Sequence, residues 1–238
     1  MSKWQVIVFD LDDTLYPERD FVYSGFRAVA AWAEKELGIP AKRGFTDLKG
    51  LFDEGTRGNI FDIWLKNLGI NTKYLVNLMV QIYREHIPHI TSYPGIPDLL
   101  QRLKVKFRLG LVTDGIADVQ RRKLAALDLE KFFDALVFSD ECGRDREAWK
   151  PSVKPFRIVL DKLRVRGSET IYIADNPHKD FFGARQVGMF TFRLRNPEGL
   201  YSFLEPPTPE YAAHVEIKDL NELETVILSI QTECKPYD

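Results

Sequence analysis

A pair of aspartates directly after a short apolar run constrains this chain more than any other feature of its sequence. Residues 6–9 are β-branched or aromatic, and Asp10 and Asp12 follow them. Such a run, ended by polar residues, is typical of a buried strand in a parallel sheet. Ligands of open α/β sheets bind outside the carboxyl ends of the strands, where one carboxylate can act as nucleophile or metal ligand and another as general acid or base. Asp-x-Asp is also common turn chemistry, so the interpretation depends on the rest of the chain.

Composition excludes several classes of function. The chain has 238 residues, 45% of them apolar and 29% charged, which is ordinary for a globular protein with a sizeable core. Its net charge of −2 gives no case for nucleic acid or an anionic membrane surface. No apolar run approaches the roughly 18 residues of a membrane-spanning helix. We expect no signal peptide before the first strand, and Cys142 and Cys234 lie in no motif, so the predicted location is cytoplasmic.

Residues 17–92 have helical rather than strand periodicity. Apolar residues recur at spacings of three and four, and Gly and Pro separate the runs. The pattern predicts a bundle of four amphipathic helices, whose aromatic stripe is expected to be core. The helices are predicted over residues 22–37, from Thr46, over 60–68 and from Thr72 to before Pro88, and the stripe is Phe26, Trp32, Phe61 and Trp64.

From residue 93 onward helix and strand patterns alternate. This rhythm predicts an α/β fold, a Rossmann-like parallel sheet with helices on both faces. The four-helix segment is then an insertion after the first strand, which gives a core domain of residues 1–16 and 93–238 and a helical domain of residues 17–92. Strands are predicted at 109–112, 135–138, 171–173, 190–194 and 214–217, and helices at 97–104, 119–127, 153–163, 180–187 and 220–230.

The later strands also end in residues suited to a phosphate site. Thr113-Asp114-Gly115 offers a hydroxyl and main-chain N–H groups to an anion, although the same triplet is a routine turn. Lys150, before a predicted helix, offers a positive charge, although Lys-Pro is often a solvated turn. Asp175 and Asp180 flank a loop and suit Mg²⁺, which prefers oxygen ligands, and Asp180 is also placed to cap the helix that follows.

Taken together, these residues resemble the motifs of the haloacid dehalogenase (HAD) superfamily, over essentially the whole chain. There are two departures: Ala174 stands where the family often has Gly, and the loop 141–148 looks longer than usual, which leaves Lys154 as the alternative to Lys150. The matching residues are Asp10, Asp12 and Thr14 for the first motif, Thr113 for the second, Lys150 for the third, and Asp175 and Asp180 for the fourth.

The resemblance implies a Mg²⁺-dependent phosphatase with a class-one helical cap. Asp10 would be the nucleophile and form an aspartyl-phosphate, and Asp12 would be the acid and base. Mg²⁺ would be held by the carboxylates of Asp10 and Asp175 and by the main-chain carbonyl of Asp12. The remaining roles are implied as follows: Lys150, Thr113 and the N–H groups of Asp114 and Gly115 hold the phosphate, Asp180 orients Lys150 or a metal-bound water, and Asn176 and Thr14 support the site.

Asp12 separates the reactions that this family performs. Members that cleave carbon–halogen bonds or phosphonates typically lack an acid at this position, whereas phosphatases and phosphomutases have one. A mutase must protect its phosphoenzyme from water, and no residue indicates this, so hydrolysis is the simpler prediction. A binding or regulatory protein that retains the fold is the alternative from another class, although such proteins usually lose a motif residue.

The sequence does not decide which phosphate ester is the substrate. The predicted partner is a small phosphorylated metabolite: a sugar phosphate, a nonulosonate phosphate or a nucleoside monophosphate. Residues 54–59 join two cap helices, and Arg57 and Asn59 are predicted to select the substrate, unless the segment is a solvated turn. The cap is expected to hinge near residues 15–18 and 91–94.

Overall fold

The computed structural model describes residues 4–70 and 72–233, so Cys234 lies outside the described part. Contacts between residues divide the chain into two compact units. One contains the chain up to Glu18 and from Thr91 onward, and the other is Arg19–Ile90. Within the described ranges, no helix has both the length and the apolar character needed to cross a bilayer. The predicted cytoplasmic location stays a prediction.

The first unit is built on a six-stranded sheet whose paired strands all run parallel. The strand order is β3-β2-β1-β4-β5-β6, so the chain moves outward from β1 to β3 and then returns to the other side of β1. The switch point therefore lies between β1 and β4, where ligands of such sheets bind. The strands are β1 (Val6–Phe9), β2 (Arg108–Thr113), β3 (Ala135–Phe138), β4 (Thr170–Ala174), β5 (Phe190–Leu194) and β6 (Val215–Ile217).

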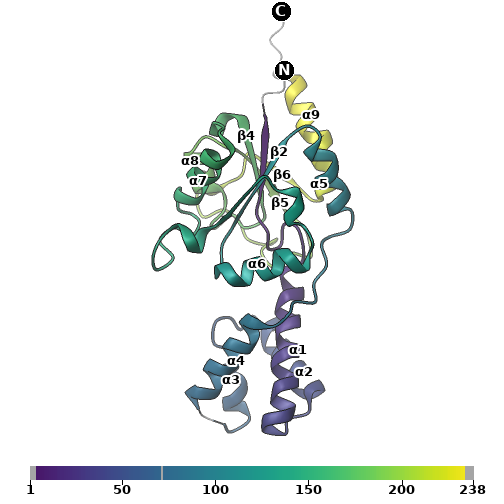
Figure 1. Ribbon diagram of the computed structural model, residues 1–238, viewed down its shortest axis with the longest axis vertical. Helices are drawn as coiled ribbons and strands as arrows, with labels where there is room; N and C mark the ends of the chain where they lie inside the picture. Colours follow the sequence, from purple (N-terminus) through teal and green to yellow (C-terminus); the bar gives the residue numbers. More distant parts are fainter. Residues whose placement is uncertain (1–3, 71, 234–238) are drawn as a thin grey trace, which may run out of the picture. The chain divides into compact units, whose positions relative to one another are not determined.

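Helices cover both faces of this sheet, with α7 and α8 on one side and α5 and α9 on the other (Figure 1). Every residue of β1 is fully buried, because alternate side chains pack against opposite helical layers. Val6, Val8 and Tyr172, for example, pack with Phe156 and Val159 of α7. These helices are α5 (Ile96–Lys104), α6 (Ala117–Ala126), α7 (Lys154–Leu163), α8 (Phe181–Gln186) and α9 (Leu223–Glu233). The predicted α/β class is confirmed.

The helical insertion after β1 is also confirmed. Its helices are α1 (Glu18–Leu37), α2 (Ala41–Asp53), α3 (Ile60–Asn67) and α4 (Lys73–Glu85). Phe26, Phe61 and Trp64 are buried, as predicted for core residues, whereas Trp32 is only partly buried. The ring centroids of Phe26 and Phe61 lie 6.2 Å apart in an edge-on arrangement, so the helices of this unit share an aromatic core.

The predicted start of the second helix at Thr46 is wrong. Helix α2 begins at Ala41, because Glu34 Oε1 accepts a hydrogen bond from the Ala41 N–H at 3.0 Å and so replaces an N-cap side chain. Thr46 instead donates its hydroxyl to the Lys42 carbonyl inside the helix, at 2.9 Å. The last helix differs too: a short 3₁₀ turn, Leu220–Glu222, precedes α9.

Candidate active site

The site lies at the carboxyl ends of three neighbouring strands. Asp10 follows β1, Thr113 ends β2 and Asp175 follows β4, and β1 lies between the other two in the sheet. Asp10 is also fastened to β4, since its N–H donates to the Ile173 carbonyl at 2.9 Å. All three side chains are at most 7% exposed. Because the strands are parallel, their ends bring together residues that are more than 160 positions apart in the sequence.

Lys150 brings a cation into direct contact with Asp10. Its side chain is fully buried, and Nζ lies 2.8 Å from Asp10 Oδ1 and 2.6 Å from Asp180 Oδ1. Nζ also donates to the Tyr172 hydroxyl at 3.1 Å. Burial alone would lower the pKa of Lys150, but Asp10 and Asp180 outweigh it and raise the pKa, so the ammonium stays charged.

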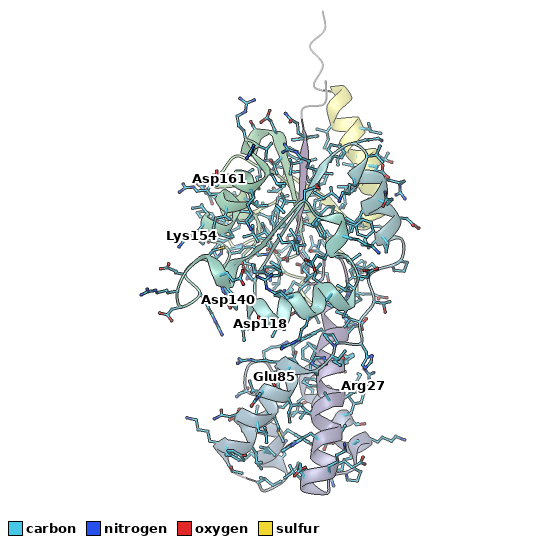
Figure 2. The ribbon with its side chains drawn as sticks, viewed as in Figure 1. Arg27, Glu85, Asp118, Asp140, Lys154 and Asp161 are labelled. Carbon is cyan, nitrogen blue, oxygen red and sulfur yellow. The ribbon has the colours of Figure 1, made fainter. Side chains whose placement is uncertain are left out.

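Lys154, the alternative to Lys150, does not reach Asp10. It projects to solvent from the start of α7 (Figure 2) and pairs with the exposed Glu147 at 3.4 Å. The loop before α7 is held instead through Asp114, whose Oδ1 accepts the Lys150 N–H at 3.2 Å. Asp114 therefore ties the end of β2 to the segment that carries Lys150.

Three buried carboxylates next to Lys150 could hold a metal ion. Oxygen atoms of Asp10, Asp175 and Asp180 lie within 4.8 Å of one another. The two oxygens of Asp180 are already engaged, Oδ1 by Lys150 and Oδ2 by the Asn176 N–H at 2.9 Å. In contrast, Asp10 Oδ2 and Asp175 Oδ2 accept no hydrogen bond from any residue that the structure describes.

Two buried carboxylate oxygens without a donor are costly, and a cation would satisfy both. Burial, and then the charge of Asp180, raise the pKa of Asp175, and burial likewise raises the pKa of Asp10 against the opposing effect of Lys150. A pair of carboxylate oxygens suits a hard divalent ion such as Mg²⁺. The donor set therefore fits such an ion, with Asp10 and Asp175 as its carboxylates.

Asp12 has a different environment from Asp10. Its Oδ1 accepts hydrogen bonds from Lys123 Nζ at 2.7 Å and from the Tyr16 hydroxyl, and its Oδ2 accepts one from Gln120 Nε2 at 2.8 Å. Burial raises the pKa of Asp12, but Lys123 and these hydrogen bonds outweigh it and lower the pKa. Both carboxylate oxygens are occupied, so only the main-chain carbonyl of Asp12 remains as the predicted metal ligand.

Sequence reasoning missed all three partners of Asp12. Gln120 and Lys123 lie one turn apart on α6, and both are buried, at 1% and 4% exposure. Gln120 Nε2 also donates to Thr113 Oγ1 at 2.6 Å, which connects Asp12 to the second motif. A polar pair at i and i+3 directly after the Thr113 motif was the available signal, since that spacing puts both on one helix face.

The remaining predicted residues of the first unit lie in the loops of the site, and their supporting roles stay predictions. Gly115 adopts φ +121°, a conformation that favours glycine, and a Cβ there would lie 3.1 Å from the Gln120 side chain. Thr14 Oγ1 is buried. Asn176 Oδ1 accepts the His178 N–H at 2.9 Å. Asp180 precedes α8 without a side-chain cap, so its predicted capping role is wrong; its carboxylate serves Asn176 and Lys150 instead.

The predicted specificity residues lie in the other unit. Arg57 donates to the carbonyls of Phe52 and Thr56 at 2.6 and 2.9 Å, and its guanidinium lies 3.7 Å from the centre of the Phe52 ring. Asn59 precedes α3 and makes no side-chain cap. Arg57 thus fastens its own loop, and the predicted contacts of Arg57 and Asn59 with substrate stay predictions.

Comparison with known proteins agrees with this arrangement. Residues 7–194 match the model of the haloacid dehalogenase-like hydrolases. The chain is 31% identical to the glyceraldehyde 3-phosphate phosphatase of Methanopyrus kandleri, over 94% of this chain and 97% of that protein. It is 30% identical to the enzyme of the same name from Methanocaldococcus jannaschii, over 95% and 98% of the two chains.

The fold is similar to that of a solved structure, the HAD-hydrolase YfnB of Bacillus subtilis bound to magnesium. The TM-score is 0.67 at 23% identity, over 95% of this chain and 99% of that one. The prediction of a phosphatase is confirmed by the near-full-length relatives, and the predicted resemblance is confirmed by the family match. The chain belongs to the haloacid dehalogenase-like hydrolases.

Proposed function

We propose that this phosphatase hydrolyses a small phosphorylated metabolite through an aspartyl-phosphate on Asp10, with glyceraldehyde 3-phosphate as the first candidate. One observation carries the proposal. Asp10 is 2% exposed, with one carboxylate oxygen 2.8 Å from the Lys150 ammonium and the other without a donor among the described residues. A nucleophile so placed can approach a phosphate group whose charge Lys150 offsets.

The first step transfers the phosphoryl group to Asp10. A carboxylate oxygen of Asp10 forms a bond to phosphorus while the bond from phosphorus to the ester oxygen breaks. The negative charge of the bound ester favours the protonated form of Asp12, against the effect of Lys123. The ester oxygen takes this proton from Asp12 and leaves as an alcohol. Lys150 offsets the charge of the phosphoryl oxygens, and Thr113 with the N–H groups of Asp114 and Gly115 binds them.

The second step returns Asp10 to its carboxylate form. Asp12, now ionised, takes a proton from a water molecule that attacks phosphorus, and the bond from phosphorus to Asp10 breaks. Lys123, Tyr16 and Gln120 hold the carboxylate of Asp12 in one orientation for both steps. When bound by Asp10 and Asp175, Mg²⁺ would supply the positive charge that lets a phosphate dianion approach these carboxylates.

The relatives support one of the three substrate classes that the sequence left open. Glyceraldehyde 3-phosphate is a sugar phosphate, one of the three predicted classes, and the phosphatases named for it match this chain over nearly its whole length. Nonulosonate phosphates and nucleoside monophosphates are the comparison substrates. We also propose that the unit Arg19–Ile90 serves as the cap that selects among them.

The proposal is tested by phosphate release from these three classes and from p-nitrophenyl phosphate. We expect phosphate release in the presence of Mg²⁺. The release should stop when EDTA removes the ion and should return when Mg²⁺ is restored. Asp10→Asn should remove turnover on every ester, because an amide cannot form the acyl-phosphate, whereas Lys154→Met should match the wild type. Turnover by Asp10→Asn, or undiminished activity after prolonged EDTA treatment, would refute the mechanism.

A further inference from the structure

A single buried carboxylate next to the site holds two distant segments together. Asp13 is 1% exposed and adopts φ +50°, which turns its side chain away from that of Asp12. Its Oδ1 accepts the Glu18 N–H at 2.8 Å, and its Oδ2 accepts the Leu200 N–H at 2.8 Å. The start of α1 and residues 196–205, which we call the β5–β6 loop, are therefore both fastened directly behind the first motif.

A second buried residue fastens the same loop to the fourth motif. Arg193 is 1% exposed, and its Nε donates to the Asp175 carbonyl at 3.2 Å. Its Nη2 donates to the carbonyls of Tyr201 and Leu204 at 3.2 and 2.7 Å. Because Asp13 holds Leu200 and Arg193 holds Tyr201 and Leu204, the second half of the β5–β6 loop is fixed in place and forms a wall beside the site.

Each of these segments carries a half-buried polar side chain: Glu18 at the start of α1, Tyr201 beside Leu200 in the β5–β6 loop, and Lys179 in the loop between Asp175 and Asp180. The charge of Glu18, followed by burial, raises the pKa of Tyr201, and Lys179 lowers it. Burial, followed by the charge of Asp12, raises the pKa of Glu18 to about 7, and Lys179 lowers it. The three groups therefore act on one another, and Glu18 also acts on Asp12.

The balance of charge at this wall is close to neutral. Lys179 makes no ion pair within 4 Å with any residue in the described ranges, but its positive charge and the negative charge of Glu18 act on each other. The charges of these two side chains thus offset each other. What remains for a ligand is the hydrogen-bonding capacity of a carboxylate and a phenol, which suits hydroxyl groups.

We propose that Glu18, Lys179 and Tyr201 form the core-side wall of the leaving-group subsite and select an uncharged, hydroxylated leaving group. This inference rests on the proposed function and deepens it. A triose meets the requirement. A leaving group of the same length that carries a carboxylate would bring a second negative charge beside Glu18, and it should be rejected.

The experiment compares three esters on the full-length enzyme with Mg²⁺: glyceraldehyde 3-phosphate, 3-phosphoglycerate and p-nitrophenyl phosphate. The wild type should prefer the triose ester to the carboxylated one. Tyr201→Phe removes one hydroxyl and should lower kcat/KM for the triose ester roughly 3- to 10-fold, mainly through KM, while sparing the aryl ester. Glu18→Gln should lower the ratio of kcat/KM for glyceraldehyde 3-phosphate to kcat/KM for 3-phosphoglycerate by a similar factor. Phe203→Ala changes an exposed residue of the same loop and should leave all three rates unchanged.

The outcomes separate this inference from the proposed function. A wild type that is inactive on every ester refutes the proposed function itself. If the wild type hydrolyses the aryl ester but prefers 3-phosphoglycerate, or hydrolyses 3-phosphoglycerate and glyceraldehyde 3-phosphate equally well, the proposed hydrolysis stands and the proposed selection by the wall is refuted. Equal losses on all esters in Tyr201→Phe, with an unchanged thermal midpoint, would also refute it, because they would assign the phenol to the chemistry common to all substrates.

Discussion

Replacing Lys150 by Met should destabilise the metal-free protein far more than replacing an exposed lysine. The change removes the ammonium shared by Asp10 and Asp180, whose side chains are 2% and 0% exposed. Loss of one partner from a buried ion pair costs about 3–5 kcal/mol, because the remaining carboxylates stay buried without a cation. For a chain of this length, that corresponds to a fall in Tm of roughly 6–20 °C.

The loss should also depend on pH. Lys150 lowers the pKa of Asp10, so its removal raises the folded-state pKa of this carboxyl further above its ordinary value. A carboxyl whose pKa is raised by folding is least costly when protonated, and stability falls as the pH rises through the folded-state pKa. The deficit of Lys150→Met should therefore be full at pH 8 and should shrink as the pH falls toward 5.

Urea unfolding in EDTA, at pH 8 and pH 5, measures both effects. Lys154→Met is the matched control, since its pair with Glu147 is about half exposed on both sides and should contribute at most about 1 kcal/mol. If Mg²⁺ binds the same carboxylates, Mg²⁺ at a hundred times its Kd should raise the free energy of unfolding of Lys150→Met by about 2.7 kcal/mol. Equal deficits for the two variants, or a deficit that grows toward pH 5, would refute the electrostatic argument.

Three further substitutions test other parts of the site. Asp12→Asn should lower kcat on a metabolite ester roughly 10²–10⁴-fold and less on p-nitrophenyl phosphate, whose oxygen needs little protonation; equal losses in steady-state kinetics would contradict this. Glu18→Gln should raise the free energy of unfolding in urea by about 1 kcal/mol at pH 8 but not at pH 4.5, because the raised pKa of Glu18, about 7, costs the folded state only once the group ionises. Arg57→Ala should raise KM for the metabolite ester and spare the aryl ester; losses on both would assign Arg57 to the loop that it fastens.

The strands and the gathering of the motifs could be predicted from sequence, because both depend on short-range patterns and a general rule. Apolar runs at 135–138 and 190–194 match β3 and β5 at both ends. Once the sheet is parallel, residues after each strand must meet at one edge, which brings Asp10, Thr113 and Asp175 together. The meeting of these three residues at one edge of the sheet therefore follows from topology.

The partners of Asp12 could not be predicted in the same way. Lys123 is 111 positions away and reaches Asp12 only because α6 turns that face inward. A Lys and a Gln on a short helix otherwise indicate a solvated surface. Arg193 is similar: it is an unusual residue in the strand Phe190–Leu194, and its guanidinium is buried because carbonyls of Asp175 and of residues 201–204 and the Glu216 carboxylate accept its hydrogen bonds. Such contacts depend on how loops return to the sheet.

The adjacent residues Asp12 and Asp13 show why the first motif affects more than the chemical step. Asp12 faces α6 and is held by three donors, whereas the left-handed turn at Asp13 directs the next carboxylate to the main chain of Glu18 and Leu200. The orientation of the acid/base group and the position of the proposed wall thus depend on the same buried turn. A displacement of this turn would change catalysis and selectivity together, so kinetic changes at Asp13 cannot be assigned to either alone unless several leaving groups are compared.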